Sequence, residues 1–253
     1  MIQKEMMTVV SHRMIAPKIF ELIMEGTLVS SMTIPGQFVH IKVTNGIDPL
    51  LRRPISICQI DRDRSRFTIV YRADGKGTGI LSEKNPGEKV DVIGPLGNGF
   101  TVEEVSPGGK ALLIGGGIGI PPLLQLSRDL AGKGVSVSHI LGLRTAADIF
   151  YENEFTCLGE TMITTEDGTY GTKGFVTSAS APLDCDVVYT CGPTSMLKAV
   201  IEKYKGKKVF ISLEERMGCG IGACFACVCR TPENGYRKIC SDGPVFRSEE
   251  VVI

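Results

Sequence analysis

The sequence has no excess of charge of either sign, because 28 Lys and Arg residues face 28 Asp and Glu residues. Such a chain has no global field that would draw it to nucleic acid or to an anionic membrane. It also lacks a long apolar run. The most apolar stretch, 111–126, is interrupted by glycines and two prolines and is too short and broken to span a bilayer. We therefore expect no nucleic-acid partner and no membrane segment.

A framework of paired cysteines is missing as well. The chain has nine cysteines, an odd number, and five of them fall between Cys219 and Cys240. Disulfide-rich chains are usually shorter, secreted and even in cysteine number. The first twenty residues show neither the uninterrupted apolar core nor the small-residue cleavage site of a signal peptide. This composition predicts a cytoplasmic protein whose clustered cysteines bind a metal centre.

The pattern of the chain changes twice along its length. Residues 1–102 contain short apolar runs separated by turn pairs such as Asp74-Gly75, which is typical of an antiparallel β-barrel. From 103 to 213, strand-like runs alternate with helix-like runs, as in a doubly wound parallel sheet. Residues 214–253 are rich in glycine and cysteine and too few to fold by apolar burial alone. The sequence thus predicts a multi-domain β plus α/β protein with a small metal-stapled C-terminal domain.

Four cysteines of the last part have the spacing of a plant-type [2Fe–2S] site. Cys219, Cys224 and Cys227 form C-x4-C-x2-C, and Cys240 follows as a distant fourth ligand. A structural zinc site usually pairs two short cysteine motifs, and only one such motif is available beside Cys240. Cys229 is surplus. It could replace Cys227 as a ligand, but the resulting spacing fits less well, so we expect a packed free thiol there.

Two elements in the first part predict a flavin nucleotide site. In Arg53-Pro54-Ile55-Ser56, the arginine offers a fixed charge suited to a pyrophosphate, and the serine hydroxyl can bond a flavin ring nitrogen. Alone, this tetrapeptide is a weak signal, and an arginine in an exposed turn explains it better. It gains weight from Gly77-Thr78, which opens a helix and presents free amides to a phosphate. The expected flavin-binding residues are Arg53, Pro54, Ile55, Ser56, Val70, Tyr71, Arg72, Gly77 and Thr78.

Two further elements predict a nicotinamide dinucleotide site in the second part. Gly115–Pro122 follows a strand and opens a helix, so that backbone amides can approach a pyrophosphate. Cys191–Pro193 lies at the end of a later strand, where doubly wound sheets bind ligands. Glu166–Gly168 ends another strand but fits a solvated turn equally well, and Arg144 alone does not mark a 2′-phosphate pocket. We therefore expect NAD rather than NADP, bound by Gly115, Gly116, Gly117, Gly119, Pro121, Cys191, Gly192 and Pro193.

These motifs resemble those of the ferredoxin–NADP⁺ reductase superfamily, which usually has an aromatic residue where Ile55 stands. The order of the three parts, and the tail from Glu215–Cys224 through Cys240–Phe246, resemble the electron-transfer subunits of NAD-dependent (type B) dihydroorotate dehydrogenases. The resemblance implies an FAD-binding barrel over 1–102, an NAD-binding domain over 103–213 and a [2Fe–2S] domain over 214–253. It also places Cys191 beside the nicotinamide, as the one candidate catalytic residue.

The resemblance further implies a role in pyrimidine (UMP) biosynthesis. An FMN-containing catalytic partner, in a heterotetramer with two copies of each chain, would oxidise dihydroorotate to orotate. Electrons would pass singly through the cluster to FAD, which would deliver hydride to NAD⁺. Two alternatives stay open: a diaphorase subunit of a sulfhydrogenase or ferredoxin-dependent transhydrogenase complex, and a zinc-stabilised nucleotide-binding module. The iron content of the purified protein would exclude or establish the last of these.

Overall fold

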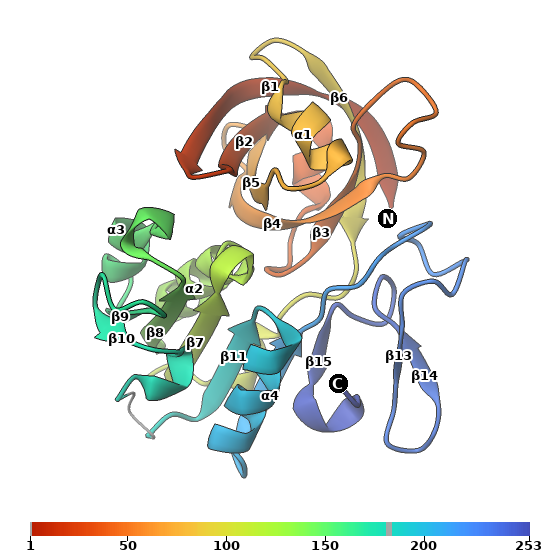
Figure 1. Cartoon of the computed structure of the whole chain (residues 1–253). Coiled ribbons are helices and arrows are strands. Elements are labelled where there is room, and N and C mark those ends of the chain that lie inside the picture. The colour runs from red at the N-terminus through yellow and green to blue at the C-terminus, as the bar shows by residue number, and fades with distance from the viewer. Residues whose placement is uncertain (1, 181–183) are drawn as a thin grey trace.

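Two sheets of different kinds make up most of the chain, as the computed structural model shows for residues 2–180 and 184–253 (Figure 1). Residue 1 of the expected barrel and residues 181–183 of the expected NAD-binding domain lie outside this described part. The barrel elements are β1 (Gln3–Ala16), β2 (Ile19–Glu25), η1 (Thr27–Ser31), β3 (Phe38–Lys42), β4 (Arg53–Asp61), β5 (Arg66–Arg72), α1 (Lys76–Ser82) and β6 (Lys89–Leu96).

The remaining elements follow a short connection. They are η2 (Val102–Glu104), β7 (Lys110–Gly116), η3 (Gly117–Gly119), α2 (Pro122–Gly132), β8 (Ser136–Leu143), η4 (Ala146–Asp148), α3 (Glu152–Thr156), β9 (Glu160–Thr165), β10 (Thr172–Lys173), η5 (Val176–Ser178), β11 (Val187–Cys191), α4 (Thr194–Lys203) and β12 (Lys208–Ser212). The last are β13 (Val228–Arg230), β14 (Tyr236–Lys238), β15 (Val245–Arg247) and η6 (Ser248–Glu250).

The first part is a closed antiparallel barrel with the strand order β1-β2-β5-β4-β3-β6. Its interior is filled by alternate residues of the strands, because side chains along a strand point to opposite faces. On β3, for example, Val39 and Ile41 belong to the barrel core, whereas Phe38 packs outward against the core shared with the sheet. Short strands with alternating burial are what the turn-punctuated sequence predicts, and the barrel is confirmed.

The second part is a doubly wound sheet with the order β10-β9-β8-β7-β11-β12-β15. All neighbours pair in parallel except β12 and β15. On β7, Leu113 packs on the same side as α2, whereas Leu112 and Ile114 pack on the side of α4, so the two helices cover opposite faces. The order reverses between β7 and β11, whose carboxyl ends, Gly115 and Cys191, are paired in register. Open α/β sheets bind their ligands at this kind of switch point.

The C-terminal residues add one strand to the second sheet and form a small two-stranded sheet besides. Strand β15 pairs antiparallel with β12, and the cysteine-rich segment adds only a two-stranded hairpin, β13-β14. Buried side chains of this tail, such as Met217, Ile239 and Phe246, belong to the same apolar core as α4. The expected boundary at residue 214 remains a prediction, since the core runs across it.

The barrel and the sheet are joined by both apolar and polar contacts. Helix α2 packs against β4, and the Gln125 side-chain oxygen accepts a hydrogen bond from the Ile60 backbone N–H at 2.9 Å. The buried Glu21 carboxylate of β2 accepts a bond from the Tyr151 hydroxyl of the sheet domain. These contacts place the β7 turn opposite β4 and β5. Among the described helices, none is both long and apolar enough to cross a lipid bilayer.

Candidate functional site: three adjoining cofactor sites

The four predicted cluster ligands come together as two pairs. The thiols of Cys219 and Cys224 lie within hydrogen-bonding reach of each other, and so do those of Cys227 and Cys240. Within the described part of the chain, no three His, Cys, Asp or Glu side chains converge as a single metal ion requires. Two pairs suit a binuclear cluster, in which each iron takes two thiolates. They suit a four-ligand zinc centre less well.

Backbone amides point at these sulfur atoms. The N–H groups of Ile221 and Ala223 donate to the Cys219 Sγ at 3.5 and 3.2 Å, and the Gly222 N–H donates to the Cys240 Sγ at 3.1 Å. Burial opposes ionisation of Cys219, but the donated bonds outweigh it and lower the pKa of this thiol to about 6. Such donors are what thiolates bound to iron require, because they stabilise negative charge on sulfur. The residues present therefore fit an iron–sulfur cluster.

The fourth predicted ligand is held by the barrel-to-sheet connection. The Asn98 side-chain amide donates to the carbonyl oxygens of Ser241 and Asp242, each at 3.1 Å, and its backbone N–H donates to Gly243 at 2.6 Å. These bonds fix the turn that follows Cys240. They explain how a ligand outside the local cysteine motif is brought to the same place.

The surplus cysteine lies on the hairpin. Cys229 belongs to β13, and its thiol donates to the Arg237 carbonyl oxygen on β14 at 3.7 Å. Burial raises its pKa, which disfavours the thiolate that iron binds. Its expected role as a packed free thiol remains a prediction that this position supports.

The predicted flavin motifs line a cavity of about 250 Å³ between the barrel and the sheet. Pro54, Ile55 and Ser56 of β4 form one wall. Phe38 of β3 and Met217 at the start of the tail also line it. Seven of the nine predicted flavin-binding residues line the cavity: Pro54, Ile55, Ser56, Val70, Tyr71, Arg72 and Thr78.

The two predicted flavin residues outside the lining, Arg53 and Gly77, lie against each other. A Cβ atom on Gly77 would overlap the Arg53 guanidinium, so only glycine allows this contact. The Arg53 Nη1 donates to the Leu51 carbonyl oxygen at 2.6 Å, and no carboxylate among the described residues pairs with the guanidinium. The neighbouring Arg52 instead pairs with Asp91 at 2.9 Å. Arg53 therefore keeps its charge available for an anionic ligand at the first turn of α1.

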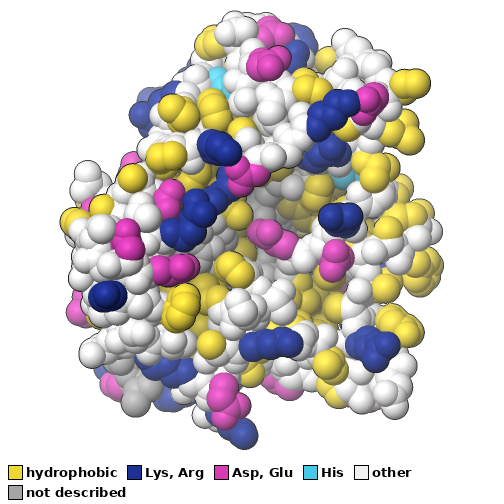
Figure 2. Space-filling view, viewed as in Figure 1, with side chains coloured by type: hydrophobic (Ala, Val, Ile, Leu, Met, Phe, Trp, Pro, Cys, Tyr) yellow, Lys and Arg dark blue, Asp and Glu magenta, His cyan; other side chains and the backbone are white. Residues whose placement is uncertain are grey.

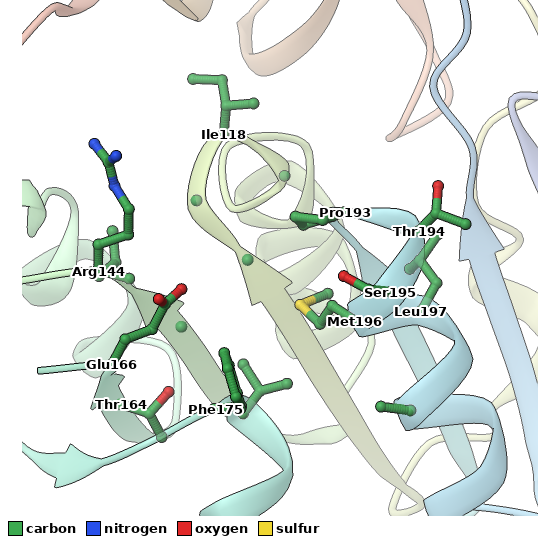
Figure 3. Close-up of a pocket in the computed structure, with 18 of the residues that line it drawn as sticks. Ile118, Arg144, Thr164, Glu166, Phe175, Pro193, Thr194, Ser195, Met196 and Leu197 are labelled. Atoms are coloured by element: carbon green, nitrogen blue, oxygen red, sulfur yellow. The ribbon is translucent and has the colours of Figure 1, made fainter.

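The predicted nicotinamide motifs line a larger cavity of about 750 Å³ at the switch point of the sheet (Figure 3). Gly116, Gly117 and Gly119 form its floor at the end of β7, and Gly192 and Pro193 form a wall at the end of β11. The turn needs glycine. A Cβ on Gly119 would overlap the Cys191 carbonyl, one on Gly116 would overlap the Met196 sulfur, and Gly117 has a φ of +54°. This cradle fits a dinucleotide pyrophosphate.

Three predicted nicotinamide residues do not line this cavity. Gly115 packs against Ile120, and Pro121 precedes the first turn of α2. Cys191 is fully buried beneath the glycine turn, and burial raises the pKa of its thiol. The structure thus places its backbone, but not its thiol, next to the cavity floor.

The two cavities meet at a junction formed by Arg72, Ile118, Leu213 and Glu214, which line both of them. The junction lies in the hollow between the barrel and the sheet domain, visible at the centre of Figure 2. The Glu214 side chain is exposed to solvent within this hollow. The surrounding protein walls still remove part of its water, and this desolvation raises the pKa of the Glu214 carboxyl. Glu214 is absent from the sequence-based set because it lies just before the recognised tail segment that begins at Glu215.

Other lining residues also escape sequence-based reasoning. The larger cavity is also lined by Phe175, which directly precedes η5, and by Thr194, Ser195 and Met196 of α4 (Figure 3). Their types carry no distinctive chemistry, so no pattern could have identified them. Glu166 is an exposed turn residue that also lines the cavity, on the same side as Arg144, so the two interpretations of Glu166–Gly168 both stay open.

Comparisons with known proteins agree with this arrangement of sites. The family model for the "Iron-sulfur cluster binding domain of dihydroorotate dehydrogenase B" matches residues 214–252. A solved structure described as an NADH-dependent reduced ferredoxin–NADP oxidoreductase is 32% identical, with a TM-score of 0.87, covering 98% of this chain and 90% of that one. A ferredoxin–NADP⁺ reductase from Neisseria gonorrhoeae, at 13% identity and a TM-score of 0.66, covers 80% and 89% and shares the fold.

Curated relatives extend the similarity over the whole chain. The "Dihydroorotate dehydrogenase B (NAD(+)), electron transfer subunit" of Geobacillus thermodenitrificans is 56% identical over 257 residues, covering 100% of both chains. The protein of the same name from Bacillus cereus is 57% identical over 259 residues, again covering 100% of both. This identity extends from the barrel through the nicotinamide cavity to the last cysteine. The chain therefore belongs to the family of dihydroorotate dehydrogenase B electron transfer subunits.

Proposed function

We propose that this chain passes electrons from a dihydroorotate-oxidising subunit to NAD⁺. The [2Fe–2S] cluster would supply single electrons when bound, and FAD would gather two of them and hand a hydride to NAD⁺. The adjacency of the three sites carries the proposal. Met217 lines the flavin cavity two residues before Cys219, and the flavin and nicotinamide cavities share Glu214. The path from the cysteine loop to the nicotinamide cavity thus runs through the flavin cavity.

The residues of this chain bind and orient the groups at each end of the path. Arg53, whose guanidinium has no carboxylate partner among the described residues, would hold the FAD pyrophosphate, and the Ser56 hydroxyl in the cavity lining would bond the flavin. Backbone amides of the Gly115–Gly119 turn bind the pyrophosphate of NAD⁺. The glycine–proline wall at Gly192 and Pro193 would orient the nicotinamide end toward the junction.

The catalytic partner supplies what this chain does not have room for. A TIM barrel that binds FMN and a substrate needs roughly 250 residues, and the 253 residues of this chain are occupied by the three sites. The partner is therefore an FMN-containing dihydroorotate-oxidising subunit, in a heterotetramer of two copies of each. A cytoplasmic location, where thiols stay reduced, remains a prediction from the cysteine usage.

Exposed apolar side chains mark the face that meets this partner. Ile221 and Phe225 of the cysteine loop are 50% and 64% exposed, and Ile47 and Leu50 of the β3–β4 connection are 85% and 75% exposed. Figure 2 shows hydrophobic side chains gathered along the right-hand edge of the molecule. Phe225 has a φ of +55°, and the Lys238 ammonium lies 4.9 Å from its ring centre. A bulky residue held exposed in a strained conformation indicates a binding role.

The alternative role in a sulfhydrogenase or transhydrogenase complex is less well supported. The relatives that carry the dihydroorotate dehydrogenase name are 56% and 57% identical over their full length, against 32% for the solved ferredoxin–NADP oxidoreductase. A reconstitution experiment separates the two roles directly. The subunit is mixed with its catalytic partner, dihydroorotate and NAD⁺ are added, and NADH formation is followed. A complex that forms without dihydroorotate-dependent NADH would contradict the proposal.

Point variants test the docking face more sharply than removal of the tail, because β15 is part of the large sheet. Phe225→Glu should weaken partner binding by about 30-fold, the effect of losing about 2 kcal/mol at an interface hot spot. Met14→Glu is the matched control, since Met14 is 63% exposed on β1 in the barrel. Both variants should still reduce an artificial dye with NADH. If the two variants bound the partner equally well, the cysteine loop would not be part of the interface.

A further inference from the structure

The histidine of β3 lies between the barrel and the cysteine loop. His40 is fully buried, although its neighbours Val39 and Ile41 fill the barrel interior. Because side chains alternate along a strand, His40 points outward on the same face as Phe38. Phe38 lines the flavin cavity. The His40 ring therefore occupies the layer between the flavin cavity and the tail.

This ring packs directly on the cysteine loop. A Cβ atom on Gly220 would lie 2.6 Å from the His40 Nδ1 and 3.2 Å from its Cε1, so the ring fills the space where a side chain would stand. Gly220 also has a φ of +73°, which L-residues with side chains rarely adopt. It directly follows Cys219, a predicted cluster ligand. Glycine is thus needed at position 220 both for the turn and for the approach of the histidine.

Neither nitrogen atom of the His40 ring makes a hydrogen bond of good geometry with a described residue, although backbone groups of Cys219 and Arg52 lie within polar reach of the ring. The backbone around it is satisfied, since the His40 carbonyl accepts a bond from the Arg52 Nη1 at 3.2 Å. A buried polar group left unpaired costs about 1–3 kcal/mol, so a native structure rarely keeps one without a reason. The other buried histidine, His139, has both nitrogens bonded, to Ser127 at 2.8 Å and to Thr161 at 2.9 Å. Among the described residues, His40 therefore has no well-formed side-chain hydrogen bond of the kind that His139 makes twice.

We propose that His40 is a positioning residue for the iron–sulfur centre, donating a ring N–H to a sulfur atom on the Cys219 side of the cluster. This inference rests on the proposed function, because it requires the cluster to be bound by the tail. The donor adds to the backbone amides of Ile221 and Ala223, which already point at the Cys219 sulfur. Through β3 it ties the cluster to the barrel wall that carries Phe38. One side chain thus sets both the reduction potential of the cluster and its place relative to the flavin cavity.

The test uses the subunit with its cofactors bound and with ¹⁵N in histidine side chains only. After reduction with dithionite, pulsed electron paramagnetic resonance should detect a ¹⁵N coupling to the cluster. His40→Gln should remove that coupling while keeping a donor group, and His139→Gln should leave it unchanged. His40→Leu removes the donor and should lower the midpoint potential. We expect a change of about tenfold in the reduction equilibrium, which is about 59 mV for a one-electron couple.

Several results would overturn the inference. The absence of ¹⁵N coupling in the labelled wild-type protein would overturn it. This measurement needs no variant, so it remains decisive even if His40→Leu fails to fold. An unchanged potential in a folded His40→Leu protein would also overturn it. In both cases, intact iron content and dihydroorotate-dependent NADH formation would leave the proposed function standing. A purified subunit without iron would instead contradict the proposed function itself.

Discussion

The nicotinamide domain and the cysteine tail bind their ligands in different ways. The domain has its own apolar core on both faces of a parallel sheet, and its cavity of about 750 Å³ is shaped by that core. The tail contributes strands of only three residues each, and its buried side chains join a core that belongs to the sheet. The nicotinamide site of the domain is therefore preformed before its ligand binds, whereas the tail depends on its metal centre to keep its shape.

This difference teaches how each site should respond to substitution. In the tail, four thiols and a few backbone amides hold one cluster, and the segment has too little apolar burial to keep its shape alone. Loss of one thiolate should therefore abolish binding. In the domain and the barrel, each side chain adds one contact to a preformed surface. Loss of one contact should reduce affinity by a factor and leave the fold intact.

The largest effect is expected in the tail, at two cysteines only two positions apart. Cys227→Ser should lose the cluster completely, because Cys227 pairs with Cys240 in the buried part of the loop. Cys229→Ser should keep it, because that thiol bonds the Arg237 carbonyl on the hairpin. Iron, acid-labile sulfide and visible absorbance measure the outcome. FAD content and NADH-driven dye reduction should stay near wild type in both variants.

The reverse result would exchange the two ligands. If Cys229→Ser loses iron while Cys227→Ser retains it, the ligand set is Cys219, Cys224, Cys229 and Cys240. If every cysteine variant lost only part of its iron, the contrast between the tail and the nicotinamide domain would fail. The tail would then bind its cluster with three thiolates, just as the domain still binds its nucleotide after the loss of one contact.

An intermediate effect is expected in the barrel, at two adjacent arginines. Arg53→Ala should weaken FAD binding by about 30-fold, because a charge-assisted bond to a phosphate contributes about 2 kcal/mol. Arg52→Ala should leave FAD affinity nearly unchanged but lower the melting temperature, because Arg52 is the partner of the half-buried Asp91. Flavin fluorescence measures the first effect and thermal unfolding the second. Equal FAD affinity in the two variants would contradict the role given to Arg53.

Much of this contrast could be predicted from the sequence, because the motifs are local. The cysteine spacing, the glycine turn after β7 and the arginine of β4 each concentrate their chemistry in a few consecutive residues. Each motif also needs a particular backbone, as the overlap of a Cβ on Gly119 with the Cys191 carbonyl illustrates. The structure at such positions can be predicted from the sequence because only one residue type is compatible with the backbone there.

The parts that could not be predicted depend on contacts between distant segments. Strand β15 has three residues and no periodicity, so nothing in it indicates pairing with β12. The junction at Glu214 exists only because the barrel and the sheet face each other. The contact of His40 with Gly220 joins segments 180 positions apart, and a single buried histidine has no sequence signature.

The smallest effect is expected in the nicotinamide cavity, where the preference for NADH over NADPH should depend on one carboxylate. Glu166 lines the cavity beside Arg144, on the side opposite Pro193 (Figure 3). Arg144 is itself drawn toward Asp148, whose carboxylate lies 3.6 Å away, so this side offers little net positive charge to a 2′-phosphate. We therefore expect NADH to reduce the flavin of the isolated subunit much faster than NADPH does.

Glu166→Gln should narrow the preference for NADH over NADPH by about fivefold, since the repulsion between two unit charges at about 4 Å in water is about 1 kcal/mol. Asp167→Asn is the matched control, because the Asp167 carboxylate bonds the Thr169 backbone and hydroxyl outside the cavity. Stopped-flow bleaching of the flavin band compares the two nucleotides in each variant, at low ionic strength where screening is weakest. If the rate of flavin reduction by NADPH rose equally in both variants, the effect would come from the net charge of the protein and not from the position of Glu166. Equal use of the two nucleotides by the wild-type chain would refute the NAD preference altogether. If only Glu166→Gln raised the rate with NADPH, the cavity would distinguish the two nucleotides by a graded difference in affinity. The tail, by contrast, would retain or lose its cluster as a whole.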